Sequence, residues 1–310
     1  MKSLVFGYFD LNFGDDWLIN RFCNKFHKDD VVLMVSDDNL FSPYRTDSRF
    51  TMAKSMGKFK AVLSCDELNI VGGSMFQRSA GWLPHFLKLL IVLISYKIMG
   101  RSNFVYGCNL KNEGGILFGL IMRIIFSTIS KFYVRDFESK ITLVDYYGVA
   151  NHKIEVGLDL AAGEMSGYAK NNNSCSISII NNSNLNKNEY FLWLEGKINN
   201  LKARGVDNFT LFSFDSGHES DLVMINLFIN FYKERNQTQN IDFDIYQYTG
   251  SIESLINEWA ISSYAICSRF HSYILASNLG QNINVLAYSQ KTIEYIKTHR
   301  QWDMEYVDVI

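Results

Sequence analysis

Short apolar runs alternate with longer segments of helical periodicity along the chain, and the short runs end at polar or glycine-containing turns. That pattern is typical of buried parallel strands joined by helices. In the first half, strands are expected at residues 3–9, 31–35, 68–71, 103–106, 131–134 and 154–156. Helices are expected between them at residues 17–26, 51–58, 86–99, 116–129 and 138–147.

The second half repeats the alternation after a segment that is small, polar and without periodicity. Its strands are expected at residues 176–180, 209–214, 243–247, 264–267 and 283–287, and its helices at 189–202, 219–234, 252–262, 272–277 and 292–298. The pattern predicts an α/β chain with two domains on mainly parallel sheets. The predicted boundaries are 1–162 for the first domain, 163–174 for the linker and 175–310 for the second domain with its closing helix.

Two long apolar runs raise the question of a membrane. Residues 86–99 and 116–129 each contain a cation, Lys88 or Arg123. A spanning helix needs about 20 apolar residues, so both shorter runs are expected to be core helices, with an interfacial helix as the alternative. The start of the chain has too short an apolar stretch for a signal peptide. The expected location is the cytoplasm, with peripheral contact at the inner membrane face as the variant.

The composition fits two globular domains and excludes extended disorder. The 310 residues are 47% hydrophobic and 20% charged, which suffices for a sizeable core. The 30 Lys and Arg residues against 32 Asp and Glu residues give a formal charge of −2, so no nucleic-acid surface is indicated. The five cysteines are far apart and form no CxxC pair, which favours free thiols over disulfides or a zinc site.

The sharpest candidate for chemistry is the segment 267–276 (CSRFHSYILA), where a short strand runs directly into a helix. A helix N-terminus attracts anions, and Arg269 adds a planar fork that matches phosphate or carboxylate. His271 can give or take a proton near neutral pH, and Ser268 is the expected N-cap. The alternative is an ordinary helix start with an exposed arginine and a packed histidine.

The turn after the first strand (DLNFGDD) is the second candidate. It contains Asn12, Gly14 and Asp15 but neither GxGxxG nor the GK[ST] of a phosphate loop. Its acidic side chains would repel a phosphate, so binding of sugar hydroxyls is the functional interpretation. The alternative is a turn whose Asp15 or Asp16 complements the dipole of the next helix.

Other strand ends carry weaker signals. Gly72 and Gly73 permit close approach of a ligand to the backbone, although a tight chain reversal explains them equally well. Arg135 and Asp136 form either a structural pair or an anion site. Lys291 follows the last strand and either contacts an anionic ligand or is solvated.

A further acidic turn follows the strand at 209–214. It contains Asp215, His218, Glu219 and Asp221, but its spacing fits no common metal signature. Helix capping by Ser216 or Asp221 is the favoured role.

Taken in chain order, these motifs resemble the polysaccharide pyruvyl transferase family. The matching elements are the N-F-G-D turn at 12–15, the glycine pair at 72–73, V-R-D-F-E-S at 134–139, Gly148, Asp159, S-R-F-H-S at 268–272 and the Tyr288/Lys291 pair. They cover nearly the whole chain in the family's order. One departure is visible, because the family commonly has three glycines in the second turn and the third position here is Ser74.

The resemblance implies two Rossmann-like halves facing one another across a cleft, similar to the GT-B glycosyltransferases. It also implies transfer of the enolpyruvyl unit of phosphoenolpyruvate to two hydroxyls of a sugar in a capsule polysaccharide, an exopolysaccharide or a precursor. The products are a cyclic pyruvate ketal and free phosphate. Phosphoenolpyruvate is then the donor substrate, and neither a metal nor a cofactor is expected. The acceptor sugar is free, polymeric or lipid-linked.

The family's basic and histidine positions carry over to Arg135, Arg269 and His271, and more weakly to Lys291. Phosphoenolpyruvate carries a phosphate and a carboxylate, so its site needs at least two cations. Arg269 is expected to hold the phosphate and Arg135 the carboxylate or phosphate. His271 is expected to act as general acid, or as base toward the attacking hydroxyl.

The acidic turn is expected to orient sugar hydroxyls through Asn12 and Asp15. Two other functions stay open. A GT-B glycosyltransferase that uses a nucleotide-sugar donor would share the two-domain layout, and a non-catalytic member of the fold would bind glycan only. The Arg269/His271 pair favours catalysis over the second of these.

Overall fold

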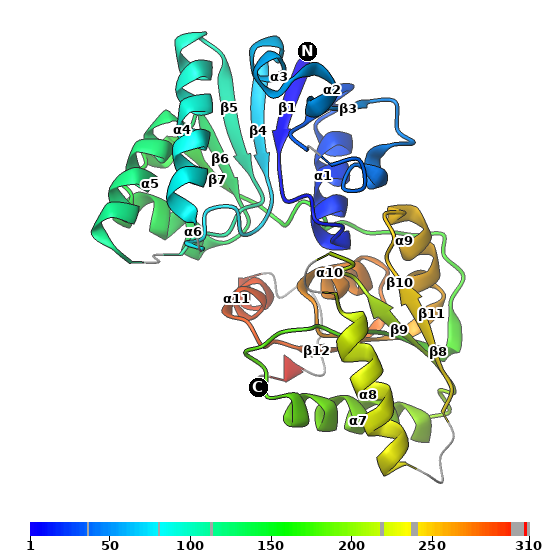
Figure 1. The fold of residues 1–310 in the computed structure, drawn as a ribbon. Helices are drawn as coiled ribbons and strands as arrows, with labels where there is room; N and C mark the ends of the chain where they lie inside the picture. Colours follow the sequence, from blue (N-terminus) through cyan, green and yellow to red (C-terminus); the bar gives the residue numbers. More distant parts are fainter. Residues whose placement is uncertain are drawn as a thin grey trace. The chain divides into compact units, whose positions relative to one another are not determined.

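The computed structural model describes residues 1–35, 37–79, 81–111, 114–217, 220–236, 241–298 and 307–308. The chain divides into two compact units (Figure 1). Unit 1 comprises Met1–Phe9 and Asp15–Leu160, and unit 2 comprises Asp10–Gly14 and Ala161–Ile310. The short segment 10–14 thus packs with the second half of the chain although it lies near the start of the sequence.

Unit 1 is built on a seven-stranded parallel sheet with the order β3-β2-β1-β4-β5-β6-β7. Its strands are β1 (Lys2–Phe6), β2 (Asp30–Leu33), β3 (Phe50–Met52), β4 (Glu67–Val71), β5 (Ser102–Tyr106), β6 (Lys131–Val134) and β7 (Ile154–Val156). This doubly wound order reverses direction between β1 and β4. Ligands of such sheets bind outside the carboxyl ends of the strands at that switch point.

The apolar runs that raised the membrane question form two of the helices of unit 1. The helices of this unit are α1 (Phe13–Lys25), α2 (Ala53–Met56), α3 (Lys58–Ser64), α4 (Trp82–Ile98), α5 (Ile116–Thr128) and α6 (Phe137–Ile141). Helices α4 and α5 contact one another (Figure 1) and contribute Phe86, Leu93, Phe118 and Met122 to the core. Each run therefore packs one face in the core, as expected, while side chains such as Ile91 and Leu117 on the other face stay exposed. Within the described residues, no helix is long and apolar enough to cross a membrane.

Unit 2 repeats the same strand order in a six-stranded sheet, β10-β9-β8-β11-β12-β13, and each neighbouring pair of its strands is parallel. The strands are β8 (Asn171–Ser178), β9 (Asn208–Ser213), β10 (Phe243–Gln247), β11 (Ser262–Cys267), β12 (Asn282–Leu286) and β13 (Val307–Asp308). The helices are α7 (Lys187–Ala203), α8 (Leu222–Arg235), α9 (Ile252–Ala260), α10 (Phe270–Asn278) and α11 (Gln290–Thr298). The switch point lies between β8 and β11.

The predicted α/β class is confirmed, and the differences fall where polar residues form regular structure. Residues 51–58, expected as one helix, contribute to edge strand β3 and then to α2 and α3, which Gly57 separates at a φ of +82°. Strand β8 starts at Asn171, inside the expected linker, because its exposed asparagines are held by backbone pairing with β11. Strand β13 was not expected, and the expected helix at 138–147 is α6 followed by a π-helical turn (Thr142–Tyr146).

All five cysteines are buried free thiols. Burial raises the pKa of Cys108 and of Cys267 to about 12. These thiols therefore pack as small apolar groups and stay protonated at neutral pH.

Candidate active site

The switch point of unit 2 places the start of α10 against the end of β8. The hydroxyl of Ser178, the last residue of β8, accepts hydrogen bonds from the backbone N–H groups of Ser268 (2.9 Å) and Arg269 (3.3 Å). It also lies 2.6 Å from the hydroxyl of Ser272 in the first turn of α10. Ser178 therefore fixes the strand-to-helix turn that the sequence singled out.

The expected N-cap role of Ser268 is wrong. Arg269 occupies the cap position with extended dihedral angles (φ −103°, ψ 143°), and its side chain does not cap the helix. The Ser178 hydroxyl from the neighbouring strand takes the two adjacent N–H groups instead. A contact between residues so distant in the chain is invisible to local capping rules.

Arg269 is held by a buried carboxylate. Its Nε and Nη2 donate to the two Asp221 oxygens at 2.8 and 2.6 Å, and Nη2 lies 3.8 Å from Asp215. Asp221 also accepts from the backbone N–H groups of Asn181 (3.0 Å) and Phe214 (3.1 Å). This two-pronged geometry fixes the guanidinium plane, and the arginine side chain is 14% exposed.

Arg269 and Asp221 each shift the pKa of the other. Burial raises the pKa of the Asp221 carboxyl, while the Arg269 charge and the N–H donors oppose that rise. Burial also acts to lower the pKa of Arg269, but Asp221 and Asp215 outweigh it and raise that pKa. The expected capping role of Asp221 is not seen, since it makes no side-chain cap on α8. His218 and Glu219 of the same turn lie outside the described residues.

The loop 10–14 joins this edge of unit 2. Asn12 and Asp215 form an isolated antiparallel bridge, and the Asn12 side-chain amide donates to the Asp215 carboxylate at 3.0 Å. The Asn12 side-chain oxygen Oδ1 accepts a hydrogen bond from the Gly14 N–H at 3.0 Å. Leu11 adopts a left-handed φ of +51°, which is uncommon for a branched side chain. Asn12 thus orients Asp215, which in turn faces Arg269.

His271 packs directly on the backbone of Gly14. A Cβ atom at position 14 would lie 2.0 Å from His271 Nδ1, so any side chain there would displace the imidazole. The φ of Gly14 is not in the left-handed region. Position 14 therefore requires glycine because the imidazole approaches its backbone closely. This contact positions His271, which is half-buried and is the second residue of α10.

The remaining residues of the acidic turn belong to unit 1. Asp15 and Asp16 lie in the first turn of α1, as the dipole interpretation expects. Asp16 is buried and accepts from the Tyr44 hydroxyl at 2.7 Å. Asp15 is half-buried.

The carboxyl edge of unit 1 contains the other predicted residues in a continuous network. The buried Gly72 needs its glycine because its φ is +146°, and the Gly73 carbonyl accepts from the Asn109 N–H at 2.8 Å. Arg135 donates to Asn109 (3.0 Å) and to Asp159 (2.8 Å). The network ties together the ends of four strands, β4 to β7.

Arg135 is enclosed within that network. Its side chain is 1% exposed and Asp159 is fully buried. Asp136 caps α6 by accepting from the Ser139 N–H at 2.6 Å. The geometry of Arg135 is that of a structural ion pair, so a contact with the donor anion requires the pair to open and stays a prediction.

The structure also places residues that sequence reasoning did not assign to the site. Ser178, Asn181 and Asn109 each follow or end an apolar strand, and that position was the available signal. Lys291 lies in α11, but its side chain is outside the described residues. Among the residues that the structure describes, no group of three or more His, Cys, Asp or Glu side chains is placed to hold a metal ion.

Comparison with solved structures shows the fold. HepE (Alr3699) of Anabaena, in complex with UDP, matches with a TM-score of 0.58 at 11% identity, over 92% of this chain and 80% of that chain. A putative UDP-N-acetylglucosamine 2-epimerase of Listeria monocytogenes matches with a TM-score of 0.58 at 8% identity, over 95% and 81%. A glycosyltransferase of Rickettsia africae matches with a TM-score of 0.55 at 12% identity, over 97% and 82%. These neighbours confirm the GT-B-like class.

Sequence comparison gives the family. A search among proteins of curated function finds no match. The family model for polysaccharide pyruvyl transferases matches residues 12–290. That range contains the turn at Asn12 and three candidate residues, Arg135, Arg269 and His271. The chain belongs to the polysaccharide pyruvyl transferase family.

Proposed function

We propose that the chain transfers the enolpyruvyl unit of phosphoenolpyruvate to two hydroxyls of a sugar in a surface polysaccharide or its precursor, forming a pyruvate ketal and releasing phosphate. Membership of the family supports a transferase of this class. The observation that carries the proposal is the pairing of Arg269 with His271 at the start of α10, on the switch-point edge of unit 2.

The donor phosphate is assigned to the N-terminus of α10. The first N–H groups of a helix lack partners within it and carry the positive end of the dipole. The Asp221 carboxylate accepts hydrogen bonds from Nε and Nη2 of Arg269. We assign its Nη1 group to the phosphate. Asp221 then serves to hold the guanidinium plane rather than to cancel its function.

The reaction needs one proton delivered and two removed. A proton adds to the methylene carbon of phosphoenolpyruvate and makes it a methyl group, which leaves an oxocarbenium centre at the adjacent carbon. One sugar hydroxyl attacks that carbon and loses its proton. The bond between that carbon and the phosphate oxygen then breaks, and the departing phosphate takes up one of the released protons. The second hydroxyl attacks the same carbon, loses its proton and closes the ketal. We assign the first proton transfer to His271, which can also accept a proton from an attacking hydroxyl.

The substitution His271→Ala tests this assignment. General acid–base catalysis contributes about 10²–10⁴-fold, so turnover should fall by that factor while the thermal unfolding temperature changes little. The measurement is phosphate release from phosphoenolpyruvate with a panel of glycosides, with products weighed for an added pyruvate ketal. Turnover close to that of the unmodified chain would remove His271 from the mechanism.

A nucleotide-sugar glycosyltransferase is the second candidate, because solved structures of similar fold include one with UDP bound and one glycosyltransferase. Thermal shift separates the two functions. Stabilisation by phosphoenolpyruvate, and none by UDP- or GDP-sugars, supports pyruvyl transfer. The opposite result supports glycosyl transfer.

A further inference from the structure

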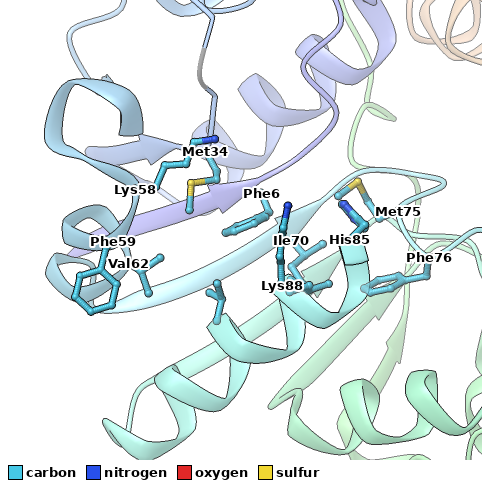
Figure 2. Close-up of a pocket in the computed structure, with 12 residues that line it drawn as sticks. Phe6, Met34, Lys58, Phe59, Val62, Ile70, Met75, Phe76, His85 and Lys88 are labelled. Carbon is cyan, nitrogen blue, oxygen red and sulfur yellow. The ribbon is translucent and has the colours of Figure 1, made fainter. Parts of the chain in front are cut away.

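Unit 1 contains an apolar pocket remote in sequence from the Arg269/His271 pair. It has a volume of about 370 Å³ and lies among β1, β4, α3 and α4 (Figure 2). Of the described residues, twelve line it, and nine of these are apolar and three basic. The volume falls within the roughly 300–1,000 Å³ of small-molecule sites, so the pocket is large enough for a ligand of its own.

The pocket reaches the carboxyl edge of the sheet. Phe6 is the last residue of β1, and Met75 and Phe76 follow the Gly72–Gly73 turn after β4. The floor is formed by strand residues such as Ile70, and Phe59 of α3 stands at the opposite end in Figure 2. Nine of its twelve described lining residues are apolar, so most of its surface suits a hydrocarbon chain.

The polar groups of the pocket are basic. Lys58 begins α3, and His85 and Lys88 lie on α4, with the lysine ammonium groups exposed beside the apolar floor (Figure 2). Burial, together with the Lys88 charge, lowers the pKa of His85, so at neutral pH the positive charge is that of the two lysines. Lysines of this kind place charge at the mouth of an apolar site while their stems line it.

The surrounding sequence has the same charge bias. Residues 53–131 contain ten Lys and Arg residues against three Asp and Glu residues, although the whole chain has a net charge of −2. Helices α3, α4 and α5 contain no acidic residue. The charge of this region is therefore complementary to an anion.

The same helices also expose apolar side chains. Phe59, which lines the pocket, is 77% exposed, and Ile91 on α4 is 66% exposed. Leu117 and Leu120 on α5 are also exposed. Exposed apolar groups mixed with cations and free of acids are typical of surfaces that meet the boundary of an anionic lipid layer.

We propose that the pocket binds the hydrocarbon chain of a phosphate-bearing lipid, whose phosphate is met by Lys58 and Lys88. The apolar floor binds the hydrocarbon chain, and the two ammonium groups bind the phosphate. The lipid comes either from an anionic phospholipid of the bilayer or from a lipid phosphate that carries sugar. The chemistry of recognition is the same for both sources.

The first experiment measures binding of dodecyl phosphate to the full chain by isothermal titration calorimetry, below its micelle concentration. Val92→Trp fills the pocket from α4 and should weaken binding by about tenfold or more, which is 1.4 kcal/mol or more. Ile94→Trp is the matched control, since this residue of the same helix is 40% exposed and does not line the pocket. Equal binding by the two variants, or no binding by the unmodified chain, would overturn the proposal.

The second experiment tests recognition of the phosphate head group by substitutions at exposed lysines of α4. Lys88→Glu should weaken dodecyl phosphate binding by about tenfold and leave binding of the uncharged dodecyl maltoside unchanged. Lys97→Glu makes the same charge change on α4 outside the pocket and should have a smaller effect. An equal loss in both variants would overturn the role of the pocket lysines.

Sedimentation with phosphatidylglycerol vesicles separates the two sources. If Val92→Trp loses vesicle binding while Ile94→Trp keeps it, the occupant is a bilayer phospholipid. If vesicle binding is unchanged and only dodecyl phosphate binding is lost, the occupant is a single lipid phosphate. Both measurements are independent of turnover, so their failure leaves the proposed transfer reaction untouched.

Discussion

The two units build the same strand order and each places an arginine–aspartate pair after strand ends, but the two pairs differ in what surrounds them. Arg135 in unit 1 is 1% exposed and bridges Asn109 and Asp159. Arg269 in unit 2 is 14% exposed and stands beside His271 at a helix N-terminus. The two pairs thus differ in exposure and in the presence of a titratable neighbour. We therefore assign the proposed proton transfer to the edge with Arg269 and His271, while the predicted contact of Arg135 with the donor anion requires its ion pair to open.

The largest effect is expected when the ion pair between Arg135 and Asp159 is broken. Arg135→Ala leaves the Asp159 carboxylate buried without its partner, and such a loss costs about 3–5 kcal/mol of unfolding free energy. Urea unfolding followed by circular dichroism measures it. Arg135→Met combined with Asp159→Leu is the control, because removing both charges should cost much less. A loss below about 1 kcal/mol for Arg135→Ala would contradict the structural role.

The next largest effect tests the packing of His271 in unit 2 and changes no charged residue. Gly14→Ala would place a Cβ 2.0 Å from His271 Nδ1 and rotate the imidazole away. A displacement of about 1 Å at a reacting group can cost about 10²-fold, so turnover should fall by that order. Gly196→Ala is the control, since this glycine lies in α7 with open space around it. If the two variants were equally active, the contact between Gly14 and His271 would have no functional weight.

The smallest effect compares the centres of the two sheets. In unit 1, the Glu67 carboxylate of β4 accepts from Ser3, Lys28 and Asn69. Unit 2 links the equivalent strands through the neutral Ser176 and Ser262 hydroxyls, 3.0 Å apart. The acid limb of the stability profile should therefore depend on the charged network.

Burial acts to raise the pKa of Glu67, but Lys28, Ser3 and Asn69 outweigh it and lower that pKa below the usual value. The stabilisation is thus fully present above the unfolded-state value of about 4.3 and is lost as pH falls through the folded-state value. Urea unfolding between pH 7 and pH 3 should show a shallower acid loss for Glu67→Gln than for the unmodified chain. Parallel profiles for the two proteins would exclude Glu67 as a source of the stability that is lost at acid pH.

The fold was predictable where burial on both faces leaves continuous apolar runs. The wholly buried β4 was predicted at 68–71, within one residue of its observed start, because such a strand shows little alternation. Strands β6, β7 and β10 are only partly buried, and they coincide with their predicted ranges through their β-branched and aromatic residues. The polar start of β8 and the short edge strand β3 gave no such signal, since their stability comes from backbone pairing with neighbours.

The candidate site was predictable in part for the same reason. Arg269 and His271 are local to one motif, and strand-to-helix turns can be read from the sequence. Asp221 lies 48 residues before Arg269, and Asn12 lies 203 residues before Asp215. Such partners are selected by the strand order, which brings the ends of β8, β9 and β11 to one edge. Local spacing contains no information about that order.

The most direct test of the central claim is the reaction of phosphoenolpyruvate with an accepting glycoside in D₂O, run with the unmodified chain and with His271→Ala. The account predicts equal amounts of phosphate and product, a product heavier by one pyruvate ketal, and one deuterium in its new methyl group. His271→Ala should form the same product about 10²–10⁴-fold more slowly. Release of phosphate without a ketal, a methyl group without deuterium, or an undiminished rate in His271→Ala would contradict the account.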